Sequence, residues 1–340
     1  NMPRIEELLS LRELVDYTQT RQFPPLMGEV LFPEQKIDAL EIEMLKGANN
    51  LPVAASVHSF DTETEIASRE GINAAIQDLA LIKRKQKISE KELIALNAPR
   101  SKQEEKQVIA RIFNDVDGLV NGVRARVEAL RMEALGTGKI VLNENGVKGT
   151  IDFGVPSGQK SAKTWLSGTP TILEDITAMV NAVVTGSGFR PTRVLTSQKI
   201  LNGILKDERI RKAMYGVNSE KVANLNDLNQ LLVSQGLPKI ATYDGMYRTQ
   251  NAKGEYVTKR YFKEDSFVLM PDGKLGDTFY GLTAEEVRLR NTPGVDIEMF
   301  GNILAQHYTT NDPVAEWIKA VATAMPSFPA ANQIYIATIS

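Results

Sequence analysis

The sequence contains no cysteine, and this absence excludes disulfide bonds, thiolate metal sites and cysteine nucleophiles. Histidine is almost as scarce: only His58 and His307 are present, far apart and without ligand-spaced partners, so a standard zinc site is not expected. Aromatic residues make up 6% of the chain and do not interleave with basic runs, which argues against a platform for single-stranded nucleic acid. With 40 Lys and Arg against 42 Asp and Glu, the chain also lacks the basic surplus of a dedicated nucleic-acid binder.

Long apolar runs are missing as well. No stretch of about 18 apolar residues occurs, so no membrane span is expected, and no signal peptide is recognisable at the start. Asn1 precedes Met2 and is expected to be a residue added for expression. What is present, 340 residues of which 42% are hydrophobic and 24% charged, indicates an ordinary globular protein with more than one lobe.

Catalytic and cofactor motifs are few. The nearest approach to a phosphate-binding loop, residues 154–161, has Gln159 where the backbone must approach a phosphate and glycine is required. The stretch Trp-Leu-Ser-Gly-Thr-Pro at 165–170 follows and cannot be the helix that such a loop needs, so this segment is interpreted as a linker. No Gly-x-Ser-x-Gly elbow is present. We therefore expect no catalytic, cofactor-binding or metal-binding residues and no enzymatic activity.

The first residues form a candidate arm. Residues 1 to about 30 begin with the pattern of a short amphipathic helix, and Pro24 and Pro25 stop any helix there. This segment is expected to lie on another surface rather than to form a core by itself. The apolar residues of the pattern are Ile5, Leu8, Leu9, Leu11, Leu14 and Val15.

A long polar loop is predicted next. Strand patterns at 36–45 and 76–88 flank a stretch rich in Asn, Ser, Thr and Glu, which has little to bury and predicts a protruding hairpin loop. Its carboxylates Asp61, Glu63 and Glu65 lack the desolvation that acid–base chemistry needs, so they are interpreted as a solvated face.

The second strand pattern carries the basic run Lys83-Arg84-Lys85-Gln86-Lys87. A solvated edge strand, on which lysine discourages unwanted pairing, is the favoured interpretation. Contact with an acidic partner is the alternative.

The strongest helical signal runs from Ser101 to Leu135. Apolar residues recur there at steps of three and four, Ser101 can cap the start, and Gly136 and Gly138 can end it, at a length of roughly 50 Å. Gly118 and Gly122 cost about 1 kcal/mol each relative to alanine, so close approach of a neighbouring backbone or a bend is expected there.

The remainder predicts a hairpin, a mixed α/β region and two final strands. Asn145-Gly146 marks the tip of a hairpin over 139–153. The C-terminal segment contains two strand patterns separated by a turn at 327–329, and we expect the lobes to be interleaved in sequence. The elements expected between are helices at 170–184, 197–205 and 224–234, strands at 192–196, 239–243 and 267–270, and a hairpin at 248–261.

This order of parts resembles the major capsid proteins of tailed phages, whose fold is named for the phage Hong Kong 97, and most closely the lambda-type capsid protein E family. The likeness covers most of the chain as element order plus several local matches. These are the Phe32-Pro33 entry, the stretches 80–88 and 127–142, Tyr243-Asp-Gly-Met-Tyr247, Phe267-Val-Leu-Met-Pro271 and Thr309-Thr-Asn-Asp-Pro313.

The resemblance implies an α+β, Hong Kong 97-like fold with an N-terminal arm, an extended β-hairpin loop, a long spine helix in a peripheral domain and an α/β axial domain. The arm and loop would lie over neighbouring subunits. The implied division is 1–35 for the arm, 36–90 for the extended loop, 91–165 and 300–324 for the peripheral domain with its spine helix at 101–135, and 166–299 and 325–340 for the axial domain.

The resemblance also implies a function. The chain is expected to self-assemble, as hexamers and pentamers, into the icosahedral head shell that encloses the double-stranded DNA of a tailed phage or prophage. Expected partners are a separate scaffolding protein (no scaffold domain precedes the arm), a portal, a decoration protein and DNA held by non-specific contact; no membrane, cofactor or metal is expected. The expected location is the virion capsid, and the host cytoplasm during assembly. An encapsulin-like cargo shell is the alternative, followed by an α/β enzyme.

Overall fold

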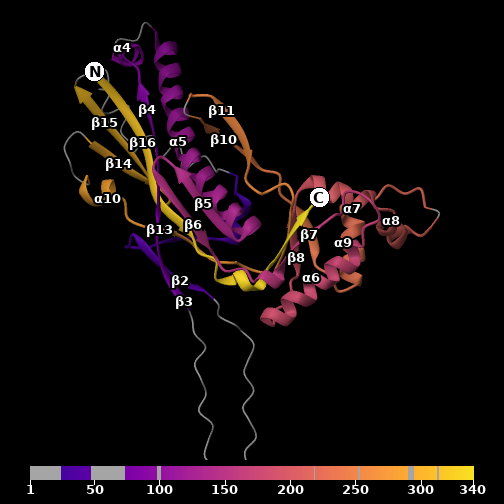
Figure 1. Ribbon diagram of the computed structural model, residues 1–340. Helices are drawn as coiled ribbons and strands as arrows, with labels where there is room; N and C mark the ends of the chain where they lie inside the picture. The colour runs from indigo at the N-terminus through magenta and orange to yellow at the C-terminus, as the bar shows by residue number, and fades with distance from the viewer. Residues whose placement is uncertain are drawn as a thin grey trace, which may run out of the picture. The chain divides into compact units, whose positions relative to one another are not determined.

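The computed structural model describes residues 24–46, 73–97, 101–217, 219–251, 253–289, 295–311 and 314–340 (Figure 1). The chain forms two compact units, each built from three separate segments. Unit 1 comprises Asn1–Ile42, Gln77–Glu128 and Asp277–Ser327, and unit 2 comprises Glu43–Ile76, Ala129–Gly276 and Phe328–Ser340. The predicted interleaving of two lobes is therefore confirmed.

Unit 1 contains a six-stranded sheet with the long strand β16 at its centre. On one side β16 pairs with β15 and β13, and on the other side it pairs with β4 from Ile88↔Glu316 to Ala80↔Ala324. Among the described strands β4 has no second neighbour, so the predicted edge strand is confirmed. The strands are β1 (Glu34–Lys36), β4 (Ala80–Ile88), β13 (Thr278–Tyr280), β14 (Val295–Phe300), β15 (Ile303–Asn311) and β16 (Val314–Pro326).

The long helix α5 (Lys102–Thr137) confirms the predicted spine helix, and its residues up to Glu128 belong to unit 1. The Ser101 hydroxyl accepts a hydrogen bond from the Glu104 amide at 3.1 Å, as the capping pattern predicted. Its apolar stripe packs on the small residues of every second position of β16, because alternate strand residues share one face. The stripe includes Ile112, Val116, Val120, Val123 and Val127, and the facing residues of β16 are Ile318, Ala320, Ala322 and Ala324.

Three short helices complete unit 1. They are α3 (Met27–Leu31), α4 (Glu90–Asn97) and α10 (Ala284–Arg288). Helix α10 begins at Thr283, whose hydroxyl accepts a hydrogen bond from the Glu286 amide. Helix α4 is entered through Ser89, which exchanges hydrogen bonds with Glu92 in a capping box.

Unit 2 contains a five-stranded sheet in the order β7-β17-β12-β8-β9, with β12 at its centre and every residue of β12 buried. Helices α6, α7 and α9 contribute buried residues to the same apolar cluster as β12 and β17. The strands are β7 (Lys160–Lys163), β8 (Arg193–Thr196), β9 (Lys239–Thr242), β12 (Ser266–Met270) and β17 (Tyr335–Ile339), and the helices are α6 (Ile172–Ser187), α7 (Gln198–Lys206), α8 (Glu208–Tyr215) and α9 (Leu225–Ser234).

Three hairpins form two-stranded sheets of their own. The turn between β5 and β6 consists of Asn145 at φ 50° and Gly146 at φ 85°, which is the backbone that a two-residue hairpin requires and confirms the predicted turn. The pairs are β2 (Glu41–Lys46) with β3 (Asn73–Asp78), β5 (Lys139–Glu144) with β6 (Val147–Asp152), and β10 (Met246–Gln250) with β11 (Tyr256–Arg260).

The two units have other boundaries than the domains expected from the sequence. Residues 277–299 lie in unit 1, not with the α/β lobe, because β13 pairs with β16. Residues 129–165 lie in unit 2, where Phe153 packs edge-on against Phe328 at 5.8 Å and β7 pairs with β17. The two C-terminal strand patterns are both confirmed, and β16 and β17 belong to different units.

Candidate assembly elements

The residues at the two ends of the predicted loop, which we call its root, are packed in unit 1. Strand β2 pairs with β3, whereas most of the second strand expected to flank the loop, residues 80–88, is β4 and pairs with β16 instead. The Leu79 amide donates to the Leu40 carbonyl at 2.9 Å. The chain passes so close to Gly281 that a Cβ there would lie 2.3 Å from the Ala39 carbonyl oxygen, which only glycine allows. The loop itself, with His58 and the acidic residues Asp61, Glu63 and Glu65, lies outside the described residues.

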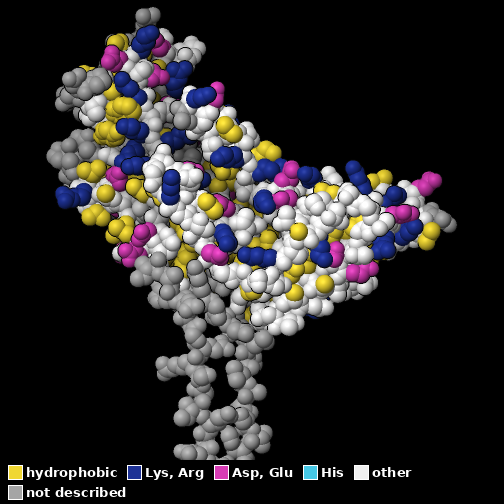
Figure 2. All heavy atoms as spheres, viewed as in Figure 1, with side chains coloured by type: hydrophobic (Ala, Val, Ile, Leu, Met, Phe, Trp, Pro, Cys, Tyr) yellow, Lys and Arg dark blue, Asp and Glu magenta, His cyan; other side chains and the backbone are white. Residues whose placement is uncertain are grey.

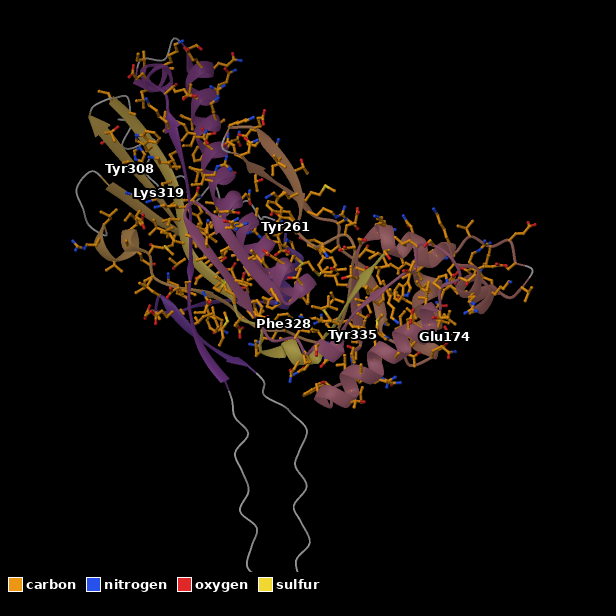
Figure 3. All side chains as sticks on the ribbon, in the orientation of Figure 1. Glu174, Tyr261, Tyr308, Lys319, Phe328 and Tyr335 are labelled. Carbon is orange, nitrogen blue, oxygen red and sulfur yellow. The ribbon has the colours of Figure 1, made fainter. Side chains whose placement is uncertain are left out.

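The next strand in the chain, β4, carries a row of exposed lysines. Lys83, Lys85 and Lys87 point away from the spine helix, because the intervening residues face it. The Lys85 ammonium lies 4.4 Å from the centre of the Trp317 ring. The Trp317 ring stacks against that of Tyr308, which is labelled in Figure 3. An exposed row of cations is the surface that the alternative interpretation, contact with an acidic partner, requires.

Helix α10 neutralises the neighbouring part of this face. Lys319 of β16 forms an ion pair with Glu285, and both side chains are largely shielded from solvent. Burial alone would raise the pKa of Glu285, but the hydrogen bond from Lys319 and the charges of Lys319 and Lys83 hold this pKa below its usual value. Lys319 and Glu285 thus neutralise each other within unit 1. The cations left for a partner on this face are the lysines of β4.

The residues that follow the arm are anchored on the spine helix. The Gly28 amide, in the first turn of α3, donates to the Glu128 carboxylate at 2.9 Å, and Glu128 is completely buried. Arg124 donates twice to Glu29, from Nε at 3.1 Å and from Nη2 at 2.6 Å. Charge-assisted and paired hydrogen bonds of this kind are the strong ones, so the arm starts from a fixed point. The arm's predicted helix lies outside the described residues.

This anchor is the functional feature that sequence reasoning missed. Asp117, Glu128 and Arg131 of this helix are buried, but their burial cannot be seen in the sequence. Charged side chains are almost never fully buried unless they are paired, so such residues mark a second packing surface on the helix.

The spine-helix glycines do not contact a neighbouring backbone, which corrects one of the two expectations for them. A Cβ at Gly118 would meet nothing within 4 Å, and one at Gly122 would meet only the Arg84 Cδ atom at 3.8 Å. Within the described part of the subunit both positions could therefore hold alanine.

We expect Gly118→Ala with Gly122→Ala to stabilise the isolated subunit by about 1 kcal/mol per site, because alanine has the higher helix propensity. If the glycines serve a bend or the close approach of another subunit, the same variant will assemble or expand differently from the parent. Denaturant unfolding and electron microscopy measure the two effects. Asn121→Ala, on an exposed position of the same helix, is the control that changes propensity but removes no glycine.

The segment that resembled a phosphate loop connects the β5–β6 hairpin to strand β7 and is held by hydrogen bonds. Gln159 is buried and its amide nitrogen donates to the carbonyls of Asn332 at 2.8 Å and Ile334 at 2.7 Å. Lys160 begins strand β7, which runs parallel to β17, so a strand and not a helix follows the loop. The segment interpreted as a linker is thus packed into unit 2 and leads directly into its five-stranded sheet.

Several other titratable groups of the described residues take part in ion pairs or hydrogen bonds. His307 Nε2 lies 3.0 Å from Glu316. Burial raises the pKa of Asp115, and a hydrogen bond from Gln86 partly opposes this. Among the described residues no group of His, Asp and Glu could hold a metal ion. In the same part of the chain, no helix combines the length and apolarity that crossing a bilayer requires.

Comparison with known proteins decides the family. The profile of the family described as phage major capsid protein E matches residues 10–339. The chain belongs to this family. It is a phage major capsid protein, a subunit that self-assembles into an icosahedral head shell. No curated protein sequence matches the chain.

Solved structures show the same fold at low sequence identity. A prophage protein of Escherichia coli CFT073, regarded as its capsid protein, superposes with a TM-score of 0.62 at 17% identity, covering 98% of this chain and 99% of that one. A phage-related protein of Bordetella bronchiseptica RB50 has a TM-score of 0.53 at 11% identity, covering 96% of each chain. The capsid protein thus has the expected Hong Kong 97-like α+β fold, and the cargo-shell alternative is not favoured.

Proposed function

We propose that unit 1 is the peripheral domain and unit 2 the axial domain of the shell subunit, and that the arm and the segment 47–72 contact neighbouring subunits. The observation that supports this is the architecture of unit 1. A spine helix packed on a sheet holds the starting points of both the arm and the loop, at Glu128 and at Gly281. Segments that start from such a scaffold are suited to contact other copies.

We propose further that the subunits form hexamers and pentamers, assembled in the host cytoplasm with a separate scaffolding protein, a portal and a decoration protein. The shell would enclose double-stranded DNA by non-specific contact. The charge supports enclosure without tight binding, because DNA affinity comes mainly from neutralising phosphates and the chain has a net charge of -2. Cations and anions are interspersed on the face in Figure 2, which fits this proposal.

We infer a structural, non-enzymatic role. The described carboxylates and cations with shifted pKa values are explained by ion pairs, hydrogen bonds or burial. Glu92, for example, has a lowered pKa because the Ser89 amide and Arg111 donate to it. A catalytic site would instead bring several perturbed groups together in one cleft.

We expect the purified protein, alone or mixed with its scaffolding protein, to form large closed particles. Contacts spread over the arm, the loop and both units favour closure into a shell over a small ring. Light scattering and negative-stain microscopy measure this. A sharp dimer or tetramer that persists under every assembly condition would contradict the proposal.

A further inference from the structure

The hairpin formed by β10 and β11 presents a face that its own unit does not cover. It forms a separate two-stranded sheet, and such ribbons are marginal by themselves. Met246 is 55% and Tyr256 60% exposed, and the Arg248 guanidinium lies 5.1 Å from the Tyr256 ring. The pairing places these side chains on one face together with Gln250, Thr258 and Arg260, of which Arg260 forms ion pairs at the base of the hairpin. We call this the outward face.

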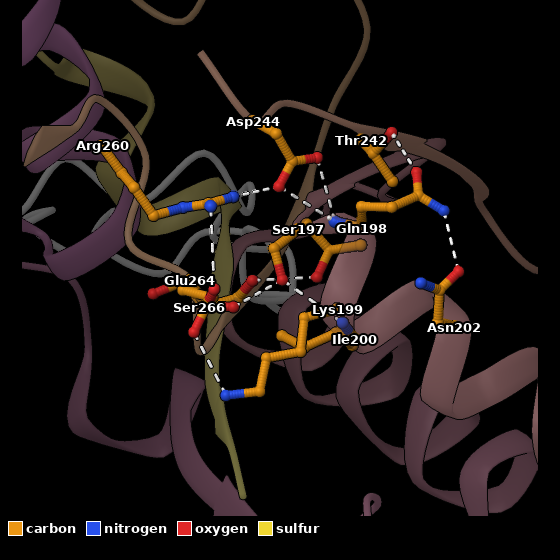
Figure 4. A network of polar contacts seen from close by, with 11 residues as sticks. Ser197, Gln198, Lys199, Ile200, Asn202, Thr242, Asp244, Arg260, Glu264 and Ser266 are labelled. Carbon is orange, nitrogen blue, oxygen red and sulfur yellow. Dashed lines mark hydrogen bonds and ion pairs between the residues drawn. The ribbon is translucent and has the colours of Figure 1, made fainter. Parts of the chain in front are cut away.

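A polar network fixes one side of the hairpin base (Figure 4). Both Asp244 carboxylate oxygens accept from the Gln198 amide at the start of α7, at 3.2 and 3.0 Å, and Asp244 also pairs with Arg260 at the end of β11. Arg260 in turn lies 3.6 Å from Glu264, which pairs with Lys199 of α7 at 3.1 Å. The two ends of the hairpin are thus tied to the same helix.

Stacked tyrosines fix the base further. Tyr261 stacks on Tyr247 at 4.8 Å and on Tyr243 at 6.2 Å, with the rings within 16° and 10° of parallel. The Tyr261 amide also donates to the Gly245 carbonyl at 3.0 Å. The ion pairs and stacked rings fix the orientation of the hairpin within unit 2. Its outward face nevertheless has no packing partner among the described residues of that unit.

We propose that the outward face of this hairpin docks on a second copy of the capsid protein. Tyr, Met and Arg are the residues enriched at interface centres, and all three are exposed here. The hairpin is basic, with Arg248, Lys253, Lys259 and Arg260 against Glu255, whereas acidic residues outnumber basic ones in the whole chain. In the remainder of another copy acidic residues outnumber basic ones, so its net charge is opposite to that of the hairpin. The inference rests on the shell-forming role of the chain.

The first test weakens the face without touching its base. We expect Arg248→Glu with Tyr256→Ser to leave the circular dichroism and unfolding midpoint of the subunit unchanged but to reduce the yield of closed particles at least about tenfold. The matched control is Lys221→Glu with Val222→Ser, because Lys221 also lies over a tyrosine, 5.1 Å from Tyr215, and Val222 is 85% exposed. This control should assemble like the parent.

The second test measures burial of the face directly and does not depend on a weakened interface. Because the chain has no cysteine, Thr258→Cys provides a single thiol on the outward face, and Val222→Cys provides one elsewhere. We expect a maleimide reagent to modify Thr258→Cys about tenfold more slowly in assembled particles than in free subunits. Val222→Cys should react at similar rates in both states.

Three results would overturn the inference: normal particles from the face variant, equal labelling of Thr258→Cys in both states, or protection already present in free subunits. Protection that appears only when another phage protein is added would replace the second copy by that protein. The parent protein, assembled in parallel, distinguishes a failure of the hairpin contact from a failure of shell assembly itself. If the parent forms no closed particles under any condition, the proposed shell assembly fails rather than the hairpin contact alone.

Discussion

Replacing residues 50–70 by a short Gly-Ser turn is expected to abolish closed particles while leaving a folded subunit. The segment is rich in Asn, Ser, Thr and Glu and has little to bury within its own subunit. Ordering it costs conformational entropy that only contacts can offset, so we expect the contacts to come from a neighbour. Removing it should shift the thermal transition little, because β2 and β3 already pair at the root.

Electron microscopy and thermal unfolding together decide this prediction. Normal closed particles from the shortened protein would show that the segment is not an intersubunit element. Failure to fold would place residues 50–70 in the subunit core. A charge-neutral variant, Asp61→Asn with Glu63→Gln and Glu65→Gln, keeps the length and separates the role of the acidic groups from that of the chain itself.

Local patterns predicted most of the elements, because each is governed by short-range chemistry. The helix expected at 101–135 is observed at Lys102–Thr137, since both its stripe and its cap at Ser101 are encoded within a few residues. The turn at Asn145-Gly146 follows from the positive φ angles that these residues tolerate. Ser197 and Asn224 likewise cap α7 and α9 through their side chains.

Local patterns do not divide the chain in the same way, and the expected boundary between 324 and 325, which separates most of β16 from β17, came from the family resemblance. Strands β16 and β17 are separated by a short turn and are similarly apolar, yet one pairs with β4 and the other with β12. Which sheet a strand joins depends on partners far away in sequence, and periodicity carries no information about them. The short elements α8 and β7 were missed because neither has enough residues to show a period.

The candidate site was predictable only in part. The β4 lysines were visible as a run, and an edge strand was expected there because lysine side chains discourage pairing with a further strand. The anchor at Glu128 was not visible, because Glu128 lies beside Val127 and outside the apolar stripe that faces the sheet. It becomes buried only when α3, about a hundred residues earlier, packs on the other side of the helix.

Glu128→Ala is therefore expected to have the largest effect on stability of any single change considered. The substitution leaves the Gly28 amide without its acceptor and creates a cavity at a fully buried position, at a cost of about 2–4 kcal/mol. Because α3 carries the arm, the root of the arm should loosen as well, and closed particles should become fewer or irregular. Denaturant unfolding of the free subunit measures the first effect and electron microscopy the second.

Glu128→Gln is the matched control, because it keeps the shape and a carbonyl oxygen that can accept from the Gly28 amide. We expect it to lose less stability than Glu128→Ala and to retain assembly, since the geometry of α3 is preserved. Arg124→Ala tests the adjacent link to Glu29, which is partly exposed, and should cost less than Glu128→Ala. If Glu128→Ala unfolds at the same denaturant concentration as the parent, this carboxylate does not anchor the arm, and its burial has another cause.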